Sequence, residues 1–184
     1  SAVDAKVYNG SPVTGTVSLG TVSGLVGTET LVISPSASNY ADSNVGVGKS
    51  TTISYSLADG TNGGLADNYS MAAVSTSGDI LQRAITITAD AKTKTYGDAD
   101  PALTAQATNV ANSDLPTGSL ERAAGENVGS YSISKSTYTY GSNYDETFED
   151  ANLVIGQRAI TITADAKTKT YGDADPALTA QATN

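Results

Sequence analysis

The residue pairs in this sequence that could bind a metal are closely spaced aspartates. Asp98 and Asp100 flank one alanine ahead of Pro101, and the pattern returns as Asp173 and Asp175. Ca²⁺ prefers oxygen ligands such as carboxylates and backbone carbonyls, although its sites usually collect more than two carboxylates. The same pattern is typical of a turn in which carboxylates accept backbone N–H groups. Asp98 and Asp100 are therefore candidate calcium ligands, with a turn as the simpler interpretation.

Four tyrosines form a second candidate site. They lie close together in the sequence as Tyr131, Tyr138, Tyr140 and Tyr144. Such rings could stack against a sugar. They could equally replace Phe in a shallow β core, with each hydroxyl at the wet boundary and the rings in cross-strand pairs. The core interpretation is favoured, and the four tyrosines are kept as candidate ligand-binding residues.

The sequence lacks the residues that most enzymes use for catalysis. The chain has no Cys and no His, so a thiol nucleophile, a thiolate zinc site and the commonest general base are missing. Paired Asp and Glu residues could hydrolyse glycosides, but no Trp is present to line a sugar cleft. We expect no enzyme, and no cofactor other than the calcium considered above.

A covalent crosslink is a further possibility. Some bacterial surface domains join a Lys to an Asn, here Lys6, Lys92 or Lys94 to Asn68 or Asn143. Such a bond requires a buried Lys, which is rare. Charges on edge strands are the simpler interpretation of these lysines.

The negative charge of the chain limits the kinds of partner that it can bind. The formal net charge is −9, which disfavours binding to nucleic acid or to an anionic membrane surface. No apolar run is long enough to span a bilayer, and the first 20 residues lack a signal-peptide pattern. We expect any export signal to lie outside this sequence.

Strands are the elements that must position these residues. Thr51–Leu57 alternates apolar and polar residues with the period of a half-buried strand, and Val13–Leu19 does the same. No helical periodicity persists for three turns. The sequence predicts an all-β fold with antiparallel sheets, because parallel strands normally need helical crossovers.

An internal repeat organises the chain. Gln82–Asn109 recurs letter for letter as Gln157–Asn184. Duplication of this length is typical of a modular array, in which one supersecondary unit is copied along the chain. Perfect duplication also argues against an enzyme, because an active site is usually singular.

A second regularity relates the first half of the chain to this repeat. One Asn-Tyr pair precedes Ile85 and another precedes Ile160 by the same interval, as Asn68-Tyr69 and Asn143-Tyr144. An Asn-Val-Gly triplet occurs at comparable places, as Asn44-Val45-Gly46 and Asn127-Val128-Gly129. A tyrosine also recurs near the start of each module, as Tyr8, Tyr96 and Tyr171. We predict modules at 1–83 and 84–157 and an incomplete module at 158–184. Only Gln82-Arg83 and Gly156-Gln157-Arg158 separate them, and such short connections restrict bending.

These motifs resemble known bacterial repeats. The segments Tyr96–Leu103, Leu120–Arg122, Gly125–Tyr131 and Asn143-Tyr144 resemble the MBG repeat. Residues 1–83 resemble the companion YDG repeat, although Asn9 stands where the name of that repeat implies Asp. The resemblance implies a spacer in a large bacterial surface or secreted adhesin, and it transfers no catalytic or binding residue.

The incomplete module should behave differently from the complete one. A partial sheet cannot bury its apolar face alone. We expect the apolar residues Ile160, Ile162, Tyr171 and Leu178 to stay mobile or to find a substitute partner. Residues 158–184 could accept an added strand or exchange with an identical segment of another molecule.

The sequence therefore predicts tandem antiparallel β modules, either sandwich-like and immunoglobulin-like or built from small β-grasp-like sheets. We expect an extracellular, non-catalytic stalk that contacts its neighbouring repeats. The alternative is an adhesin module that binds a carbohydrate or a host protein through its Tyr-rich second module.

Overall fold

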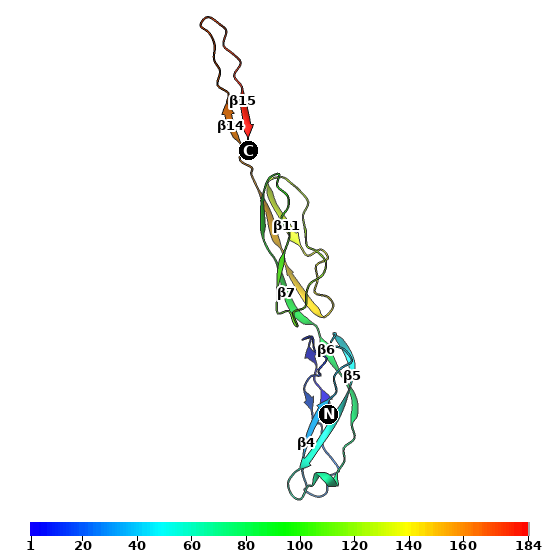
Figure 1. The fold of residues 1–184 in the computed structure, drawn as a ribbon. Coiled ribbons are helices and arrows are strands. Elements are labelled where there is room, and N and C mark those ends of the chain that lie inside the picture. The colour runs from blue at the N-terminus through cyan, green and yellow to red at the C-terminus, as the bar shows by residue number, and fades with distance from the viewer. Residues whose placement is uncertain (184) are drawn as a thin grey trace. The chain divides into compact units, whose positions relative to one another are not determined.

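The structure, a computed structural model, describes residues 1–183, and its fold is all-β as predicted (Figure 1). Within these residues the only helix is the short 3-10 helix η1 (Ala66–Asn68). This part of the chain therefore holds no helix long and apolar enough to cross a membrane.

The chain forms two compact units. The first comprises Ser1–Ile87, Ala107–Gly118 and Thr137–Glu149, and the second comprises Thr88–Gln106, Ser119–Ser136 and the chain from Asp150 on. The first unit thus holds residues of both complete repeats. The modules at 1–83, 84–157 and 158–184 follow the sequence repeat rather than these contacts, and their boundaries stay a prediction.

A four-stranded sheet forms the body of the first unit. In spatial order its strands are β2 (Lys6–Val7), β6 (Val74–Leu81), β5 (Gly46–Asp59) and β4 (Leu31–Ala37). Ile53 of β5 and Ile80 of β6 are completely or almost completely buried, and Tyr40 is buried as well. The strand predicted at Thr51–Leu57 is confirmed as part of β5.

The predicted strand at Val13–Leu19 is wrong for most of its length. Only β3 (Val17–Ser18) forms there, paired with β1 (Ala2–Val3). Val13 and Leu19 are exposed. Alternation alone cannot supply a neighbouring strand, and backbone groups of this stretch pair with side chains instead: the Val13 N–H donates to the Ser11 hydroxyl at 3.2 Å, and the Val13 carbonyl accepts from Lys6 at 2.6 Å.

The second unit contains a sheet with the same plan. In spatial order its strands are β10 (Glu121–Arg122), β11 (Gly129–Ser134), β13 (Ala151–Gly156) and β8 (Lys92–Thr95). Its core is formed by Ile133, Leu153 and Ile155. In both sheets the opening strand pairs with the closing strand, and the closing strand pairs with the strand that starts at an Asn-Val-Gly triplet. The two complete repeats therefore share one ground plan.

Each of these sheets contains one parallel pair, which corrects the expectation of purely antiparallel sheets. β2 pairs with β6 in parallel, and β8 pairs with β13 in parallel. A parallel connection needs a crossover of a dozen or more residues, usually a helix. Here the other strands of the repeat form that crossover, so no helix is needed.

The remaining strands continue the second repeat and its copy. A three-stranded sheet has the order β12 (Tyr144–Glu149), β7 (Arg83–Ala89) and β9 (Ala105–Thr108). The copied segment forms an antiparallel hairpin of β14 (Thr161–Ala164) and β15 (Ala180–Thr183) in the second unit.

The two identical segments differ in how deeply their side chains are buried. Ile85 and Ile87 of β7 are buried, whereas their copies Ile160 and Ile162 are exposed. Tyr171 and Leu178 of the copy are exposed as well. The hairpin thus has the strands of the repeat without the neighbours that cover them.

Candidate functional site

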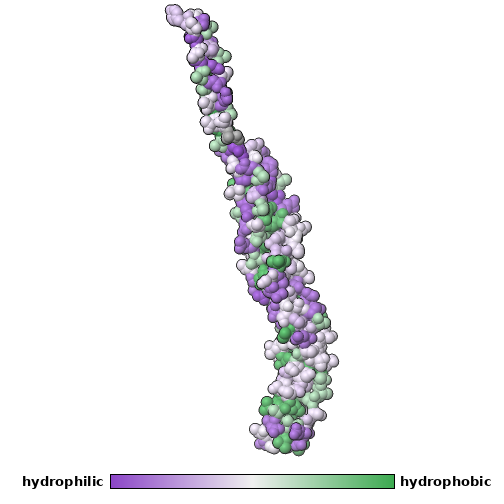
Figure 2. Space-filling model, viewed as in Figure 1, coloured by the Kyte–Doolittle hydropathy of each residue, from purple (hydrophilic) through white to green (hydrophobic). Residues whose placement is uncertain are grey.

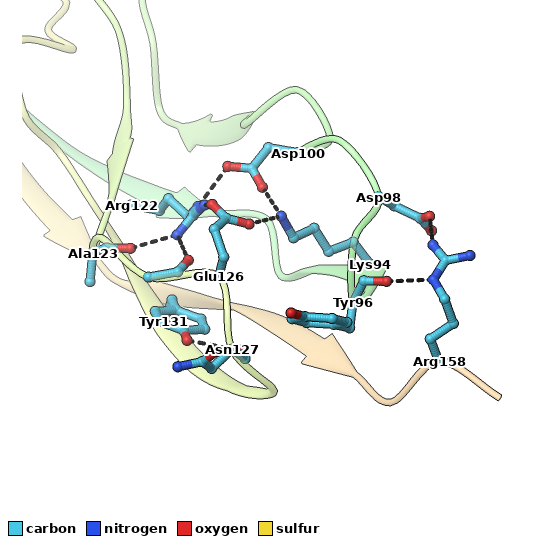
Figure 3. A network of polar contacts seen from close by, with 11 residues as sticks. Lys94, Tyr96, Asp98, Asp100, Arg122, Ala123, Glu126, Asn127, Tyr131 and Arg158 are labelled. Atoms are coloured by element: carbon cyan, nitrogen blue, oxygen red, sulfur yellow. Dashed lines mark hydrogen bonds and ion pairs between the residues drawn. The ribbon is translucent and has the colours of Figure 1, made fainter. Parts of the chain in front are cut away.

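The candidate calcium ligand Asp100 is part of a four-residue charge network in the second unit (Figure 3). Its two carboxylate oxygens lie 2.6 Å from Lys94 Nζ and 2.6 Å from Arg122 Nε. The carboxylate of Glu126 contacts the same two cations. Two cations and two anions therefore form a closed ring that ties β8 and β10 to the loop before β11.

The pKa values in this network shift as the pairing requires. The guanidinium of Arg122 and the ammonium of Lys94 lower the pKa of the Asp100 carboxyl. Lys94 and then Arg122 lower the pKa of Glu126, and the two carboxylates raise the pKa of Lys94. Both acids are thus held in the charged form that pairing needs.

The second calcium candidate, Asp98, binds a different cation. Its carboxylate accepts a hydrogen bond from the guanidinium of Arg158, which also donates to the Tyr96 carbonyl at 2.7 Å (Figure 3). Among residues 1–183, no three acidic side chains gather as a metal site would require. Calcium binding by Asp98 and Asp100 stays a prediction.

The structure gives the four candidate tyrosines different surroundings. Tyr138, Tyr140 and Tyr144 form a chain of edge-to-face contacts, with ring centroids 6.3 and 5.8 Å apart. Tyr131 instead lies under the guanidinium of Arg122, whose Cζ is 5.4 Å from the centroid of the Tyr131 ring. Tyr144 is 4% exposed, so it offers little surface to a ligand. Sugar binding by the other tyrosines stays a prediction.

A further candidate site in the first unit lies where the two complete repeats meet, around Tyr8 and Tyr144. Their rings make an edge-to-face contact at 5.4 Å, and both hydroxyls donate to the same carboxylate oxygen of Asp114, at 2.9 and 2.7 Å. The backbone N–H of Ala111 donates to the Tyr144 hydroxyl at 3.2 Å. We call this arrangement the tyrosine joint.

Burial and hydrogen bonding both raise the pKa values of the two tyrosines in this joint. Burial, followed by the hydrogen bond to Asp114, raises the pKa of Tyr144 to about 12. The same two causes raise the pKa of Tyr8. Both phenols therefore stay protonated and act as donors to the carboxylate at neutral pH.

The linker between the repeats is hydrogen-bonded on both sides. Arg83 donates to the Tyr8 carbonyl at 3.3 Å and to the carbonyl and side-chain oxygens of Asn109, each at 2.6 Å. Gln82 donates to the carbonyls of Ser142 and Tyr144. A linker whose side chains bind residues of both repeats has little freedom to hinge.

Asn143 connects the first repeat to the second at a further point. Its side-chain oxygen accepts from the Val45 N–H at 2.9 Å, and its amide donates to Asn44. Gly10 also approaches the second repeat closely, because a Cβ placed on it would lie 2.5 Å from Asn112 Cβ. The recurring Asn-Val-Gly and Asn-Tyr motifs thus meet each other in space.

Sequence reasoning noted Tyr8, Asn143 and Tyr144 as periodic landmarks but missed Asp114 and Ala111. Those two residues belong to none of the recurring motifs, so no repeated pattern in the sequence marks them. The crosslink hypothesis is also untested. Lys6 donates to Asn9 and to backbone carbonyls, and Lys94 lies in the charge network.

Family models identify the repeats. The MBG domain (YGX type) matches residues 85–154 and 160–184, and the YDG domain matches residues 1–77. Searches of curated proteins and of solved structures gave no match to the chain. The two MBG matches cover just over half of the sequence, so this chain belongs to the MBG domain (YGX type) family and carries a YDG domain ahead of its MBG repeats.

Proposed function

We propose that the chain is a non-catalytic spacer in a large bacterial surface or secreted adhesin, where it holds a distal binding region away from the cell. The tyrosine joint carries this proposal. A stalk needs connections that resist bending, and here a two-residue linker is reinforced by buried aromatic rings that share one carboxylate.

The contacts of the joint explain how it would resist bending. Tyr8 and Tyr144 are both buried, so opening the joint would expose two aromatic rings to water. It would also break the hydrogen bond from the Tyr8 hydroxyl to the Asp114 carboxylate, which is worth about 1.5–3 kcal/mol because its acceptor is charged. Arg83 and Asn143 add hydrogen bonds on either side. Bending therefore has to break several interactions together.

The extracellular location and the partners belong to the same proposal. The domains present are repeat families, and a net charge of −9 keeps such repeats soluble and apart. The neighbouring repeats are the first partners. The exposed hairpin at 158–183 is a further contact point, through strand addition or exchange with another molecule.

Electron spin resonance distance measurements test the spacer function within the first unit. The chain has no Cys, so labels at Ser56→Cys and Thr147→Cys report only on these sites. We expect one narrow distance distribution in the parent, broadened by Tyr144→Ala or Arg83→Ala. Tyr171→Ala, which alters an exposed tyrosine of the hairpin, is the control and leaves the width unchanged. A broad distribution in the parent chain would overturn the proposal.

The adhesin alternative predicts a different result. A glycan array or a panel of host proteins should then bind the parent chain, and Tyr138→Ala with Tyr140→Ala should abolish binding while the fold stays intact. For a spacer we expect no binding on either panel.

A further inference from the structure

The ammonium of Lys6 binds neutral oxygen atoms of the loop that follows β2. Its Nζ donates to the side-chain oxygen Oδ1 of Asn9 at 3.0 Å, and to the carbonyls of Ser11 and Val13 at 2.5 and 2.6 Å. A lysine ammonium has three protons to donate, so these bonds use all of them. Burial lowers the pKa of Lys6, since desolvation disfavours the charged form. A cation is thus held against the amide side chain of Asn9.

Lys94 occupies the corresponding place in the second repeat. Each lysine lies on the opening strand, two residues before the opening tyrosine. Lys94 pairs with the two carboxylates of the charge network, and Lys49, the other lysine of residues 1–83, pairs with Asp42 at 2.8 Å. Charged groups are sparse in the first repeat, and Figure 2 shows mainly pale or green residues on the visible face around β4 and β5. Lys6 differs from both lysines because an amide stands where they have a carboxylate.

The amide that Lys6 binds belongs to the dipeptide Asn9-Gly10. The backbone nitrogen of the next residue can attack the side-chain carbon of an Asn, and Gly permits this best because it has no Cβ. Asn9 Oδ1 also accepts from the Ser11 N–H at 3.1 Å, an Asx turn that folds the side chain back over the Asn9-Gly10 peptide bond. Within residues 1–183 the Gly10 N–H makes no hydrogen bond, and Asn9 is exposed to water. The dipeptide therefore has the nucleophile, the electrophile and the access to water that deamidation needs.

We propose that Asn9 is a deamidation site promoted by Lys6, and that the product is an aspartate at position 9. The Gly10 nitrogen attacks Asn9 Cγ and gives up its proton, and Nδ2 leaves as ammonia, which closes a five-membered imide. Water then adds to Cγ, the bond from Cγ to the Gly10 nitrogen breaks, and that nitrogen recovers a proton. One water is consumed and one ammonia is released, with no change in oxidation state. The proposal goes beyond the spacer function, because it changes the covalent structure of the first repeat.

Lys6 acts on both steps of this reaction. Negative charge develops on Asn9 Oδ1 when Cγ is attacked, and the ammonium already donates to that atom. The imide has two carbonyl carbons. Water that attacks the backbone carbon gives isoaspartate, whereas water that attacks Cγ gives aspartate. Because Lys6 polarises the carbonyl of Cγ, we expect aspartate as the main product.

The product suits its surroundings better than the amide does. A carboxylate at position 9 would give Lys6 the charged acceptor that Lys94 has, and it would oppose the lowering of the Lys6 pKa by burial. The triplet Tyr8-Asn9-Gly10 would then carry the three letters that name the YDG domain. Isoaspartate would instead lengthen the backbone beside Gly10, where a Cβ would already lie 2.5 Å from Asn112.

The chain contains an internal reference for this reaction. Asn62-Gly63 is its only other Asn-Gly dipeptide, and Asn62 is exposed as Asn9 is. The side-chain amide of Asn62 donates to the Thr28 carbonyl at 2.9 Å. Asn62 thus presents the same dipeptide to water, with a carbonyl as its partner in place of the ammonium.

Peptide mass spectrometry of the full chain, incubated at mildly alkaline pH, tests the proposal. Deamidation adds one mass unit, and a chain carrying Asn9→Asp provides the standard that separates aspartate from isoaspartate by elution. We expect Asn9 to react about tenfold faster than Asn62, below the value of a buried oxyanion donor because the site is exposed. Lys6→Met should lower the rate at Asn9 to that of Asn62 and turn the product toward isoaspartate. Lys6→Arg keeps a charged donor and should keep aspartate as the product.

Two controls keep the result interpretable. Lys92→Met removes a lysine that donates to Thr104 in the second repeat, and it should leave both rates unchanged. If Lys6→Met disturbs folding, the parent chain in concentrated urea replaces it, and the two dipeptides should then react at equal rates because the contact with Lys6 is lost.

Three results would overturn the proposal. They are equal rates at Asn9 and Asn62 in the folded chain, isoaspartate as the main product at position 9, and a rate at Asn9 that neither Lys6→Met nor urea lowers relative to Asn62. A lasting loss of ammonia without the uptake of water would mean a bond between Lys6 and Asn9, which also contradicts it. The distance measurement on the first unit is independent of these outcomes.

Discussion

The identical segments of the repeat allow one substitution to be made in two environments. Ile87 and Ile162 share the same flanking sequence, yet Ile87 is 0% exposed and Ile162 is 68% exposed. Replacing each by Ala makes the same chemical change in the same local sequence. The difference in destabilisation then measures the effect of the tertiary neighbours, which include the strands and side chains that cover Ile87.

The expected magnitude follows from the buried side chain. Ile→Ala removes three carbons, worth about 0.8 kcal/mol each when fully buried, or about 2.4 kcal/mol. The cavity left in a packed core raises the cost at Ile87 to about 3–4 kcal/mol. At Ile162 only about a third of the side chain is removed from water, so we expect a loss below about 1 kcal/mol.

Urea unfolding followed by tyrosine fluorescence measures both losses. Hydrogen exchange of residues 83–156 assigns the transition to the complete repeat, since several repeats need not unfold together. Ile85→Ala and Ile160→Ala provide a second matched pair. If both positions of a pair lose the same free energy to within about 0.5 kcal/mol, the inference that tertiary neighbours distinguish the copies is wrong.

Four further predictions concern the first unit. Tyr144→Phe should cost about 1–3 kcal/mol in urea unfolding, because it removes one donor to Asp114 and leaves a buried N–H unpaired. The pKa of Tyr144 is raised from 10.0 to about 12, so its contribution is complete below pH 10 and is lost as the pH rises through 12, measurable as a falling urea midpoint. Gly10→Ala should destabilise by about 1–3 kcal/mol, since its φ is 74° and the new Cβ would clash with Asn112. Tyr40→Phe should be neutral or stabilising in thermal unfolding, because the Tyr40 hydroxyl is buried with no hydrogen-bond partner among the described residues.

Each of these predictions has a result that contradicts it. For Tyr144→Phe it is an unchanged unfolding midpoint, and for the pH dependence it is a midpoint constant between pH 10 and 12. Gly24→Ala is the control for Gly10→Ala, because its φ is 90° but nothing lies within 4 Å of the added Cβ. Equal losses at the two glycines would remove Asn112 from the explanation. A clear loss in Tyr40→Phe would show that its hydroxyl has a partner.

The sequence by itself determined the fold class, the repeat families and the local structure of the copied segment. Both copies form paired strands. Each also has the same backbone hydrogen bond of 2.9 Å, from the Asp90 N–H to the Thr104 carbonyl and from the Asp165 N–H to the Thr179 carbonyl. In each copy a lysine forms an ion pair with the aspartate six residues further on. These contacts join residues within one copied segment, so identical letters give identical contacts.

Only the tertiary structure decided which residues are buried and which of them form a site. Ile87 is buried and Ile162 is exposed because covering a strand requires neighbours from elsewhere in the chain. The tyrosine joint has the same origin. Asp114 joins Tyr8 to Tyr144 across more than a hundred positions of sequence, and it belongs to none of the recurring motifs. Periodicity identifies the repeated tyrosines, whereas their shared carboxylate follows from how the repeats pack.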